Sequence, residues 1–205
     1  MAQITDGIRS ILASPHLYDL FQRMVGVDAW RQDFVKRFVR PQGFERVLDI
    51  GCGTARILDD LPAGVVYFGF DASQSYIAAA RERYGQRAHL TCALVSEMAI
   101  EEAGRFDLVL VSGVLHHLDD MQANQLLEVA RFALREGGRL VAIDPCHALG
   151  QSRIAQYVIR RDRGQDVRTA PAYEALARAV FNDVQGQIVH RRWIPYTHWV
   201  MECRP

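Results

Sequence analysis

The sequence has no surplus of charge of either sign and few cysteines. Lysine plus arginine and aspartate plus glutamate number 24 each, so the formal net charge of the 205 residues is zero. This balance gives no general attraction to nucleic-acid phosphates or to anionic membranes, so we expect neither as a partner. Cys52, Cys92, Cys146 and Cys203 are too far apart in the sequence for a CxxC metal or redox motif. We therefore expect buried free thiols and no metal site.

Long apolar runs, internal repeats and low-complexity tracts are also missing. No stretch approaches the roughly 18 uninterrupted apolar residues that span a bilayer. The first ten residues, MAQITDGIRS, contain no apolar signal-peptide core. We therefore expect a cytoplasmic protein. The length and the hydrophobic share of 49% suit a single domain with its own core.

The first part of the chain has helical periodicity. One helix is predicted at 15–25, after a serine that suits the cap position, and a second at 28–39. In the second, aromatic residues recur every four positions until Pro41 ends the pattern. We interpret residues 1–42 as an N-terminal helical cap.

From residue 46 onward, short apolar runs alternate with amphipathic stretches, as in repeated βα units. The predicted strands are VLDI at 47–50, VVYFGF at 65–70, HLTCALV at 89–95, DLVLVSG at 107–113 and RLVAID at 139–144. The predicted helices between them are 55–61, 73–84 and 120–135, the last of them ended by Gly137 and Gly138. Strands that are apolar on both faces are typical of a parallel sheet covered by helices. Residues 45–145 are thus interpreted as the core of the domain.

The regular alternation ends after the fifth predicted strand. Residues 146–183 are interpreted as a helical insertion on the substrate side, and residues 184–205 as a closing antiparallel strand pair. The helices are predicted at 154–161 and 171–181, and the strands at 187–193 and 197–203. The whole chain predicts an α/β fold: a doubly wound, Rossmann-like, mostly parallel seven-stranded sheet with an antiparallel C-terminal strand pair, helices on both faces and an N-terminal helical cap.

The central motif is an apolar strand that runs into a glycine turn. It contains Asp49, Gly51 and Gly53. The two glycines remove the Cβ atoms that would keep backbone amides from a ligand, and the helix predicted next would present its unpaired N–H groups. Asp71 ends the following strand, at the spacing of about twenty residues where a carboxylate accepts hydrogen bonds from a ribose diol. The pattern predicts a nucleotide-type ligand.

The run DIGCGTA at 49–55 resembles the first motif of the class I S-adenosylmethionine-dependent methyltransferases of the small-molecule type, D/E-x-G-x-G-x-G, with alanine at the third glycine. The resemblance continues in FDLVLVSGVLHHL at 106–118 and in LREGGRL at 134–140, where Glu136 replaces the usual proline. It covers residues 45–145. The resemblance implies that this region binds S-adenosyl-L-methionine as the cofactor.

The resemblance also implies roles for particular residues. Asp49 is expected to orient the methionine amino end, Gly51 and Gly53 to line the cofactor, and Asp71 to hold the ribose. Further lining positions are expected where the second, third and fourth strands end. The predicted cofactor-binding residues are Asp49, Gly51, Cys52, Gly53, Asp71, Ala72, Leu94, Val95 and Ser112.

His116 and His117 are the candidate catalytic residues. They follow the fourth predicted strand, at the edge where open α/β sheets bind ligands, and an imidazole accepts a proton near neutral pH. The alternative is that the pair packs beneath the loop and caps the helix that begins near Asp119. Methyl transfer depends mainly on placing acceptor and donor in line, so a base is needed only where the acceptor must lose a proton.

Acceptor recognition is expected from the N-terminal helices and from the insertion after the fifth strand. Asp144 and His147 flank the end of that strand, whereas His190 and His198 are interpreted as structural histidines. Trp30 belongs either to an apolar lid or to the ordinary core. Five arginines, at 153, 160, 161, 163 and 168, face either an anionic group or solvent. The predicted substrate-binding residues are Tyr18, His147, Arg160 and Tyr196.

These observations predict methyl transfer to an oxygen, nitrogen or carbon atom of a small-molecule metabolite. Two alternatives stay open. A nucleic-acid methyltransferase is disfavoured by the neutral charge and by SGVL at 112–115, where an NPPY or DPPY motif would hold a flipped base. A non-catalytic binding or regulatory module that keeps the cofactor fold is disfavoured by the intact Asp49, Gly51, Gly53 and Asp71.

Overall fold

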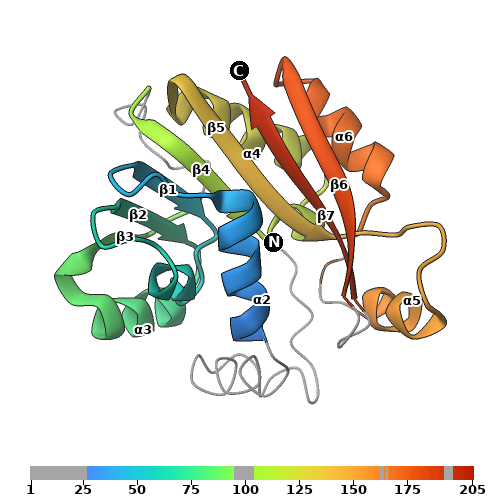
Figure 1. Ribbon diagram of the computed structural model, residues 1–205, viewed down its shortest axis with the longest axis horizontal. Helices are drawn as coiled ribbons and strands as arrows, with labels where there is room; N and C mark the ends of the chain where they lie inside the picture. Colours follow the sequence, from blue (N-terminus) through green and yellow to red (C-terminus); the bar gives the residue numbers. More distant parts are fainter. Residues whose placement is uncertain (1–26, 95–103, 162–163, 165, 192–195) are drawn as a thin grey trace.

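A computed structural model describes residues 27–94, 104–161, 164, 166–191 and 196–205, in which a seven-stranded sheet has helices on both faces (Figure 1). The strands are β1 (Arg46–Ile50), β2 (Val66–Asp71), β3 (Ala88–Cys92), β4 (Phe106–Ser112), β5 (Leu134–Pro145), β6 (Asp183–Arg191) and β7 (Tyr196–Arg204). Their order across the sheet is β3-β2-β1-β4-β5-β7-β6. Strands β1 to β5 pair in parallel, and β7 is antiparallel to both β5 and β6. The predicted fold class is confirmed.

Two apolar clusters lie on opposite faces of the sheet. The helical segments are α2 (Val27–Phe34), η2 (Val35–Val39), η3 (Arg56–Asp59), α3 (Gln74–Tyr84), η4 (Gly85–Arg87), η7 (Leu115–His117), α4 (Asp120–Ala133), α5 (Arg153–Arg160) and α6 (Ala170–Arg178). One cluster joins α2, η2, η3 and α3 to the sheet, and the other joins α4 and α6 to it. Figure 1 shows α2 crossing in front of the sheet and α4 behind it. The sheet is thus buried on both faces, which explains its continuous apolar strands.

The carboxyl ends of the parallel strands meet at one edge of the sheet. Ile50, Asp71, Ser112 and Pro145 are the last residues of β1, β2, β4 and β5. Because β7 runs the opposite way, its first residue, Tyr196, lies at this edge too. Open α/β sheets bind ligands at this edge, so five strands deliver side chains to one region.

The predicted stop of the long helix at Gly137 and Gly138 is wrong. Helix α4 ends at Ala133, and β5 begins at the next residue. The pairing of β4 with β5 then jumps from Phe106–Leu134 to Leu108–Arg139, so the intervening residues of β5 bulge out of the register. Gly137, with φ of +75°, supplies the backbone conformation that this bulge needs. The two glycines therefore shape a strand bulge and not a helix end.

The helix predicted at 55–61 is also wrong in type and length. Segment η3 is a single 3₁₀ turn, and Ala55 before it has φ of +55°. Leu61 precedes Pro62, whose ring disfavours the α conformation in the residue before it. The backbone between these two points has room for one turn only. The expected helix N-terminus therefore supplies no row of N–H groups at the glycine turn.

The other elements differ from the prediction mainly at their ends. The helix predicted at 28–39 is α2 followed by the π-helical turn η2, and β6 begins four residues before the predicted strand. Tyr196, predicted in the connection, is the first residue of β7. The helix predicted at 15–25 lies outside the described residues. No helix within the described ranges is long and apolar enough to cross a membrane.

Candidate active site

The glycine turn after β1 is held against β2 and beneath the loop that follows β4. The backbone N–H groups of Gly51 and Cys52 both donate to the carbonyl of Phe70, at 2.7 and 3.0 Å. Gly51 and Gly53 have φ of +76° and +55°, which side chains rarely tolerate. A Cβ atom at Gly51 would also strike the side chain of Val114. Glycine is therefore required at 51 by both conformation and space, as the sequence predicts for a turn that a ligand approaches closely.

Asp49 is a buried carboxylate beside this turn, with 4% of its surface exposed. Its Oδ2 accepts a 2.5 Å hydrogen bond from the Tyr67 hydroxyl, whereas its buried Oδ1 has no hydrogen-bond partner among the described residues. Burial raises the pKa of Asp49 to about 7, the Tyr67 bond lowers it in part, and the charge of Asp71 raises it. A buried, unfilled acceptor suits a cationic ligand group.

Asp71 ties the glycine turn to the start of α3. Its Oδ2 accepts from the backbone N–H of Gly53 and its Oδ1 from that of Ser73, each at 2.8 Å. Burial raises the pKa of this carboxyl group, and the two backbone bonds oppose the rise. Each carboxylate oxygen can accept a further bond. Asp71 can therefore hold a diol while it keeps the turn in place.

His116 lies at the end of β4 and is fixed by a carboxylate from β5. Its Nδ1 lies 2.7 Å from Oδ1 of Asp144, and its backbone N–H donates to the same oxygen at 3.1 Å. Only 5% of His116 is exposed. The half-buried His117 lies against it, with ring centroids 4.0 Å apart. Burial raises the pKa of Asp144, and the bonds from His116 lower it in part.

Arg168 holds the segment Leu115–Leu118, which carries His116 and His117 and which we call the histidine loop. Its guanidinium donates to the carbonyls of Leu115 and Leu118, at 2.9 and 2.7 Å, and forms a 2.8 Å ion pair with Asp120. Asp119 caps α4 with a reciprocal capping box, so the loop ends in a fixed helix start. The prediction that Arg168 faces an anionic ligand or solvent is wrong, because its donors are used by the loop.

The fold is shared with methyltransferases of solved structure. One is the Burkholderia thailandensis 1,6-didemethyltoxoflavin N1-methyltransferase, solved with 1,6-didemethyltoxoflavin and S-adenosylhomocysteine. Its TM-score is 0.62 at 23% identity, over 99% of this chain and 93% of that chain. The fold is also shared with PhzM, a pyocyanin biosynthetic protein, with a TM-score of 0.75 at 16% identity, over 98% of this chain and 63% of that chain.

The amino-acid sequence has relatives of the same kind. A ubiquinone biosynthesis O-methyltransferase of Aromatoleum aromaticum is 31% identical over 124 residues, which cover 58% of this chain and 52% of the relative. The chain thus spans about half the length of the curated relatives that it matches. A family model described as a methyltransferase domain matches residues 48–140. Residues 48–140 thus carry a methyltransferase domain, as that family model describes it. The resemblance seen in the sequence is confirmed.

The prediction of S-adenosylmethionine as the cofactor is also confirmed. The methyltransferase domain has hydrogen-bond donors and acceptors that fit this molecule. The orphaned Oδ1 of Asp49 suits the ammonium group of the methionine end. The remaining lone pairs of Asp71 suit a ribose diol. Beside Gly53, a Cβ atom would meet nothing within 4 Å, so the turn leaves open space next to these carboxylates.

The other predicted cofactor residues of the methyltransferase domain lie around the same edge. Cys52 is half-buried, and burial raises the pKa of its thiol. Ala72 and Ser112 are exposed at the ends of β2 and β4. Leu94 is 43% exposed shortly after β3, where the N–H of Ala93 bonds to the carbonyl of Asp71. Val95 lies outside the described residues. Contact of these side chains with the cofactor stays a prediction.

The predicted substrate residues are spread along the carboxyl-end edge and the insertion. His147 is half-buried, and its backbone N–H bonds to the carbonyl of Arg168. Arg160 is exposed at the last position of α5. Tyr196 is half-buried at the start of β7, with its ring 4.9 Å from that of His198. Tyr18 lies outside the described residues.

The sequence interpretation missed several contacts of the methyltransferase domain. Tyr67 was not singled out, although a tyrosine in an otherwise apolar strand is a signal, because a buried hydroxyl needs a partner. The bond between His116 and Asp144 joins residues far apart in the sequence. The ring of His198 stacks on that of Trp30, with centroids 5.5 Å apart, so it belongs to a cluster at the ligand edge.

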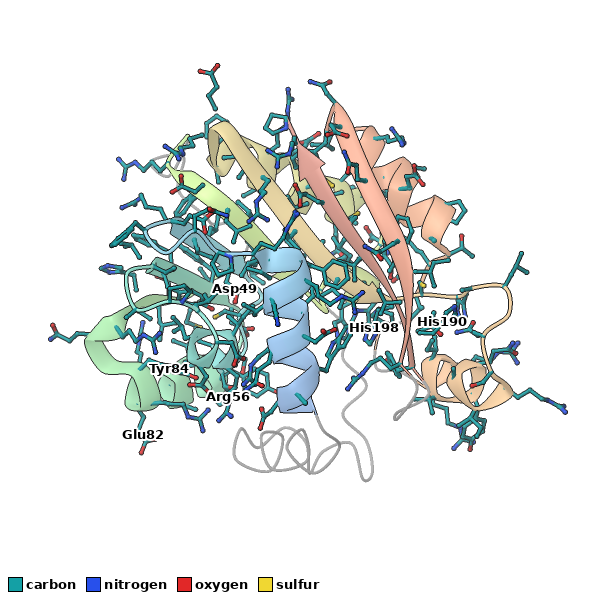
Figure 2. All side chains as sticks on the ribbon, in the orientation of Figure 1. Asp49, Arg56, Glu82, Tyr84, His190 and His198 are labelled. Carbon is teal, nitrogen blue, oxygen red and sulfur yellow. The ribbon has the colours of Figure 1, made fainter. Side chains whose placement is uncertain are left out.

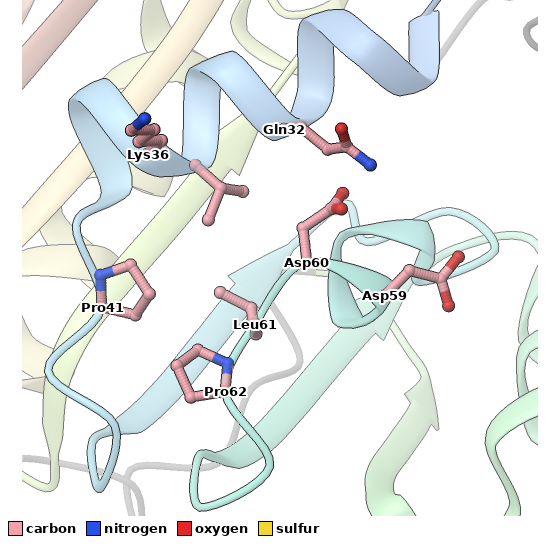
Figure 3. Close-up of a pocket in the computed structure, with 8 residues that line it drawn as sticks. Gln32, Lys36, Pro41, Asp59, Asp60, Leu61 and Pro62 are labelled. Atoms are coloured by element: carbon pink, nitrogen blue, oxygen red, sulfur yellow. The ribbon is translucent and has the colours of Figure 1, made fainter.

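A cavity of about 440 Å³ lies between α2 and the loop that follows η3 (Figure 3). Its acidic lining is partly paired, since Asp60 forms an ion pair with Arg31. The lining residues are Gln32, Val35, Lys36, Pro41, Asp59, Asp60, Leu61 and Pro62. None of them belongs to the glycine turn or the histidine loop, so this cavity is not assigned to the cofactor.

Proposed function

We propose that this chain transfers the methyl group of S-adenosylmethionine to an oxygen, nitrogen or carbon atom of a small-molecule metabolite. The observation that carries the proposal is the buried Asp49, whose unfilled Oδ1 lies beside a glycine turn held by Asp71. A carboxylate kept in this environment costs free energy unless a cationic ligand compensates it. The name of the Aromatoleum relative, an O-methyltransferase, supports an oxygen acceptor.

The residues of the turn would bind the two ends of the cofactor. Asp49 would accept hydrogen bonds from the ammonium group of the methionine end, and Asp71 would accept hydrogen bonds from the ribose. When bound, the cofactor supplies a methyl group on a sulfonium, which is already an activated electrophile. Gly51 and Gly53 keep Cβ atoms away from the ligand. The main task of the chain is then to hold the acceptor in line and to exclude water.

A base is required where the acceptor is a hydroxyl. Asp144 would hold His116 as the Nδ1–H tautomer, which leaves the basic lone pair at Nε2. The proton of the acceptor hydroxyl would move to that atom. His117, less buried and in contact with the His116 ring, is the second candidate for this role.

The remaining assignments complete the proposal. His147, Arg160 and Tyr196 would contact the acceptor, together with Tyr18. Residues 45–145 would form the cofactor core, residues 146–183 a substrate-side insertion and residues 1–42 a cap. The partner is a small molecule and not a nucleic acid, and the expected location is cytoplasmic. The zero net charge supports a small-molecule partner over a nucleic acid.

The first test is calorimetric titration of the purified chain with S-adenosylmethionine and with S-adenosylhomocysteine. We expect saturable binding of both compounds and none of NAD. Asp71→Ala should weaken binding at least about tenfold, because it removes charge-assisted hydrogen bonds. A screen of small phenols and amines with methyl-labelled cofactor then tests transfer itself.

Asp33→Ala is the matched control, because the Asp33 side chain on α2 is 44% exposed and, among the described residues, pairs with the nearby Arg37 alone. It should bind as the wild type does. A folded wild type that binds neither adenosyl compound would overturn the proposal. Cofactor binding without transfer to any acceptor in the screen would favour the non-catalytic module, and transfer to DNA or RNA would favour the nucleic-acid alternative.

A further inference from the structure

Arg191 lies at the carboxyl-end edge of the sheet, as the last residue of β6. The register of β6 with β7 sets it opposite Tyr196. On the other side of β7, His198 lies opposite Pro145, where β5 ends. Arg191 is therefore two strands away from the end of the strand that carries Asp144. It is on the edge where an acceptor must approach, and the proposed function gives it no role.

The Arg191 side chain lies over the first of three neighbouring aromatic rings. Its guanidinium carbon lies 5.0 Å from the centroid of the Trp30 ring. Trp30 stacks on His198 with the ring planes 15° apart, and the ring of Tyr196 follows at 4.9 Å from that of His198. Figure 2 shows His198 beside α2, the helix that carries Trp30. We call these four residues, Trp30, Arg191, Tyr196 and His198, the Trp30–Arg191 cluster.

Arg191, like Arg46, is a half-buried arginine that forms no ion pair among the described residues, in contrast to Arg31 and Arg168. Arg31 pairs with Asp60, and Arg168 pairs with Asp120. Arg191 is half-buried, yet among the described residues its guanidinium forms no ion pair and no hydrogen bond. Within those residues it contacts only the indole ring of Trp30. Burial lowers the pKa of its guanidinium without an opposing carboxylate. A desolvated cation of this kind costs free energy until a negative group reaches it.

We propose that the Trp30–Arg191 cluster is an anion-binding subsite for the acceptor, in which Arg191 binds a carboxylate or phosphate group of that molecule. A guanidinium binds such groups through two parallel hydrogen bonds. The rings on one side hold the guanidinium plane and lower the local dielectric, which strengthens its attraction to an anion. The inference rests on the proposed methyl transfer, and it narrows the acceptor to a small molecule that carries an anionic group.

The test uses the chain saturated with S-adenosylhomocysteine and three probes of similar size: benzoate, phenyl phosphate and phenol. Dissociation constants are measured by titration with NMR detection. We expect one or both anions to bind at least about tenfold more tightly than phenol, as charge-assisted bonds do. A preference for benzoate would indicate a carboxylate acceptor, and a preference for phenyl phosphate a phosphorylated one.

Arg191→Gln keeps a hydrogen-bond donor but removes the charge, and it should reduce anion binding to the level of phenol. Arg191→Lys should restore part of the preference, because the charge returns without the planar fork. Arg37→Gln is the matched control. Arg37 also lies over a ring, 4.9 Å from the centroid of Phe38, but at the far end of the α2–η2 segment.

The thermal midpoint separates this subsite from a structural role. If the role of Arg191 is to bind a ligand, Arg191→Gln should leave the midpoint of thermal unfolding unchanged or raise it, because the substitution removes a cation that has no counter-charge. Anions that bind the wild type no better than phenol, or bind Arg191→Gln equally well, would overturn the subsite. In both cases S-adenosylhomocysteine would still bind. A wild type that does not bind S-adenosylhomocysteine would instead overturn the proposed function.

Discussion

Asp49 is the residue on which cofactor binding and stability compete. Its carboxyl group is buried against Tyr67, and its pKa of about 7 lies above its ordinary value of 3.8. Between these two pH values the native state keeps a proton that the unfolded chain has released. The free energy of unfolding therefore falls as the pH rises through this window. The same ionised group is what a cationic ligand end requires.

Replacing Asp49 with asparagine should remove most of this pH dependence. A shift of about three pKa units corresponds to about 4 kcal/mol, so the wild type should lose up to that much unfolding free energy between about pH 4 and pH 8 relative to Asp49→Asn. Urea unfolding at a series of pH values measures the difference. Asp71 and Asp144, whose pKa values are also raised, should leave a decline of the same sign in the variant.

Asp33→Asn is the control, because the Asp33 side chain on α2 is 44% exposed, far more than that of Asp49. Its pH profile should match the wild type. Equal slopes for Asp49→Asn and the wild type would show that Asp49 is ionised throughout the window. The Asp49→Asn variant should also bind S-adenosylhomocysteine less tightly than the wild type at pH 8, because it offers no negative charge to the ammonium.

At the scale of elements, the histidine loop η7 is held by residues from two other segments, strand β5 and the insertion that follows it. Asp144 of β5 bonds to His116, and Arg168, which precedes α6, bonds to the carbonyls at both ends of the loop. A Cβ atom at Gly164 would strike His116, so the insertion also packs directly on the loop. The candidate base therefore depends on the insertion for its position.

Arg168→Gln should lower the free energy of unfolding by about 2 kcal/mol. The carbonyls of Leu115 and Leu118 would lose the charged donor that binds them in place of water. Arg168→Lys should recover little, since one ammonium cannot reach both carbonyls as the fork does. Chemical denaturation measures the loss. Arg178→Gln removes an exposed pair with Glu174 on α6 and a long, 3.4 Å bond to the Val184 carbonyl, and it should cost about 0.5 kcal/mol. Equal losses for Arg168 and Arg178 would contradict the proposed support.

Local patterns predicted the elements well where one pattern decides the structure. The continuous apolar runs gave β1, β2 and β4 to within a residue at each end, and Ser73 and Asp119 cap α3 and α4 as polar cap residues should. The failures have non-local causes. From the sequence alone Gly137 predicts a helix stop, but the register of β5 with β4 places it in a strand bulge.

The candidate site was predictable only where its residues are close in sequence. Asp49 and Gly51 belong to one short motif, so their joint role follows from spacing. The bond of Tyr67 to Asp49 and the approach of Arg191 to Trp30 depend on strand register and on how α2 lies across the sheet. Sequence periodicity describes single elements, and it contains no information about which distant side chains meet.

At the scale of the whole molecule, α2 connects the cofactor side of the sheet to the acceptor side. Arg31 on α2 forms an ion pair with Asp60 beside η3, and Trp30 stacks on His198 of β7. The two apolar clusters also share β1, β4 and β5, because each of these strands is buried on both faces. Neither half of the sheet can lose its packing without exposing the other. We therefore expect one cooperative unit.

Cooperativity predicts how the whole chain responds to S-adenosylhomocysteine. A ligand that binds only the folded state at a hundredfold excess over its dissociation constant adds about 2.7 kcal/mol of stability. For a chain of this size that corresponds to a rise of about 5–10 °C in the melting temperature. Calorimetric scans should show a single transition that moves as a whole, and at the same concentration the transition of Asp71→Ala should move by about half as much or less, because tenfold weaker binding adds only about 1.4 kcal/mol. Two transitions, of which only one shifts with the ligand, would mean that the cofactor core and the β6–β7 end unfold separately, and that α2 does not couple them.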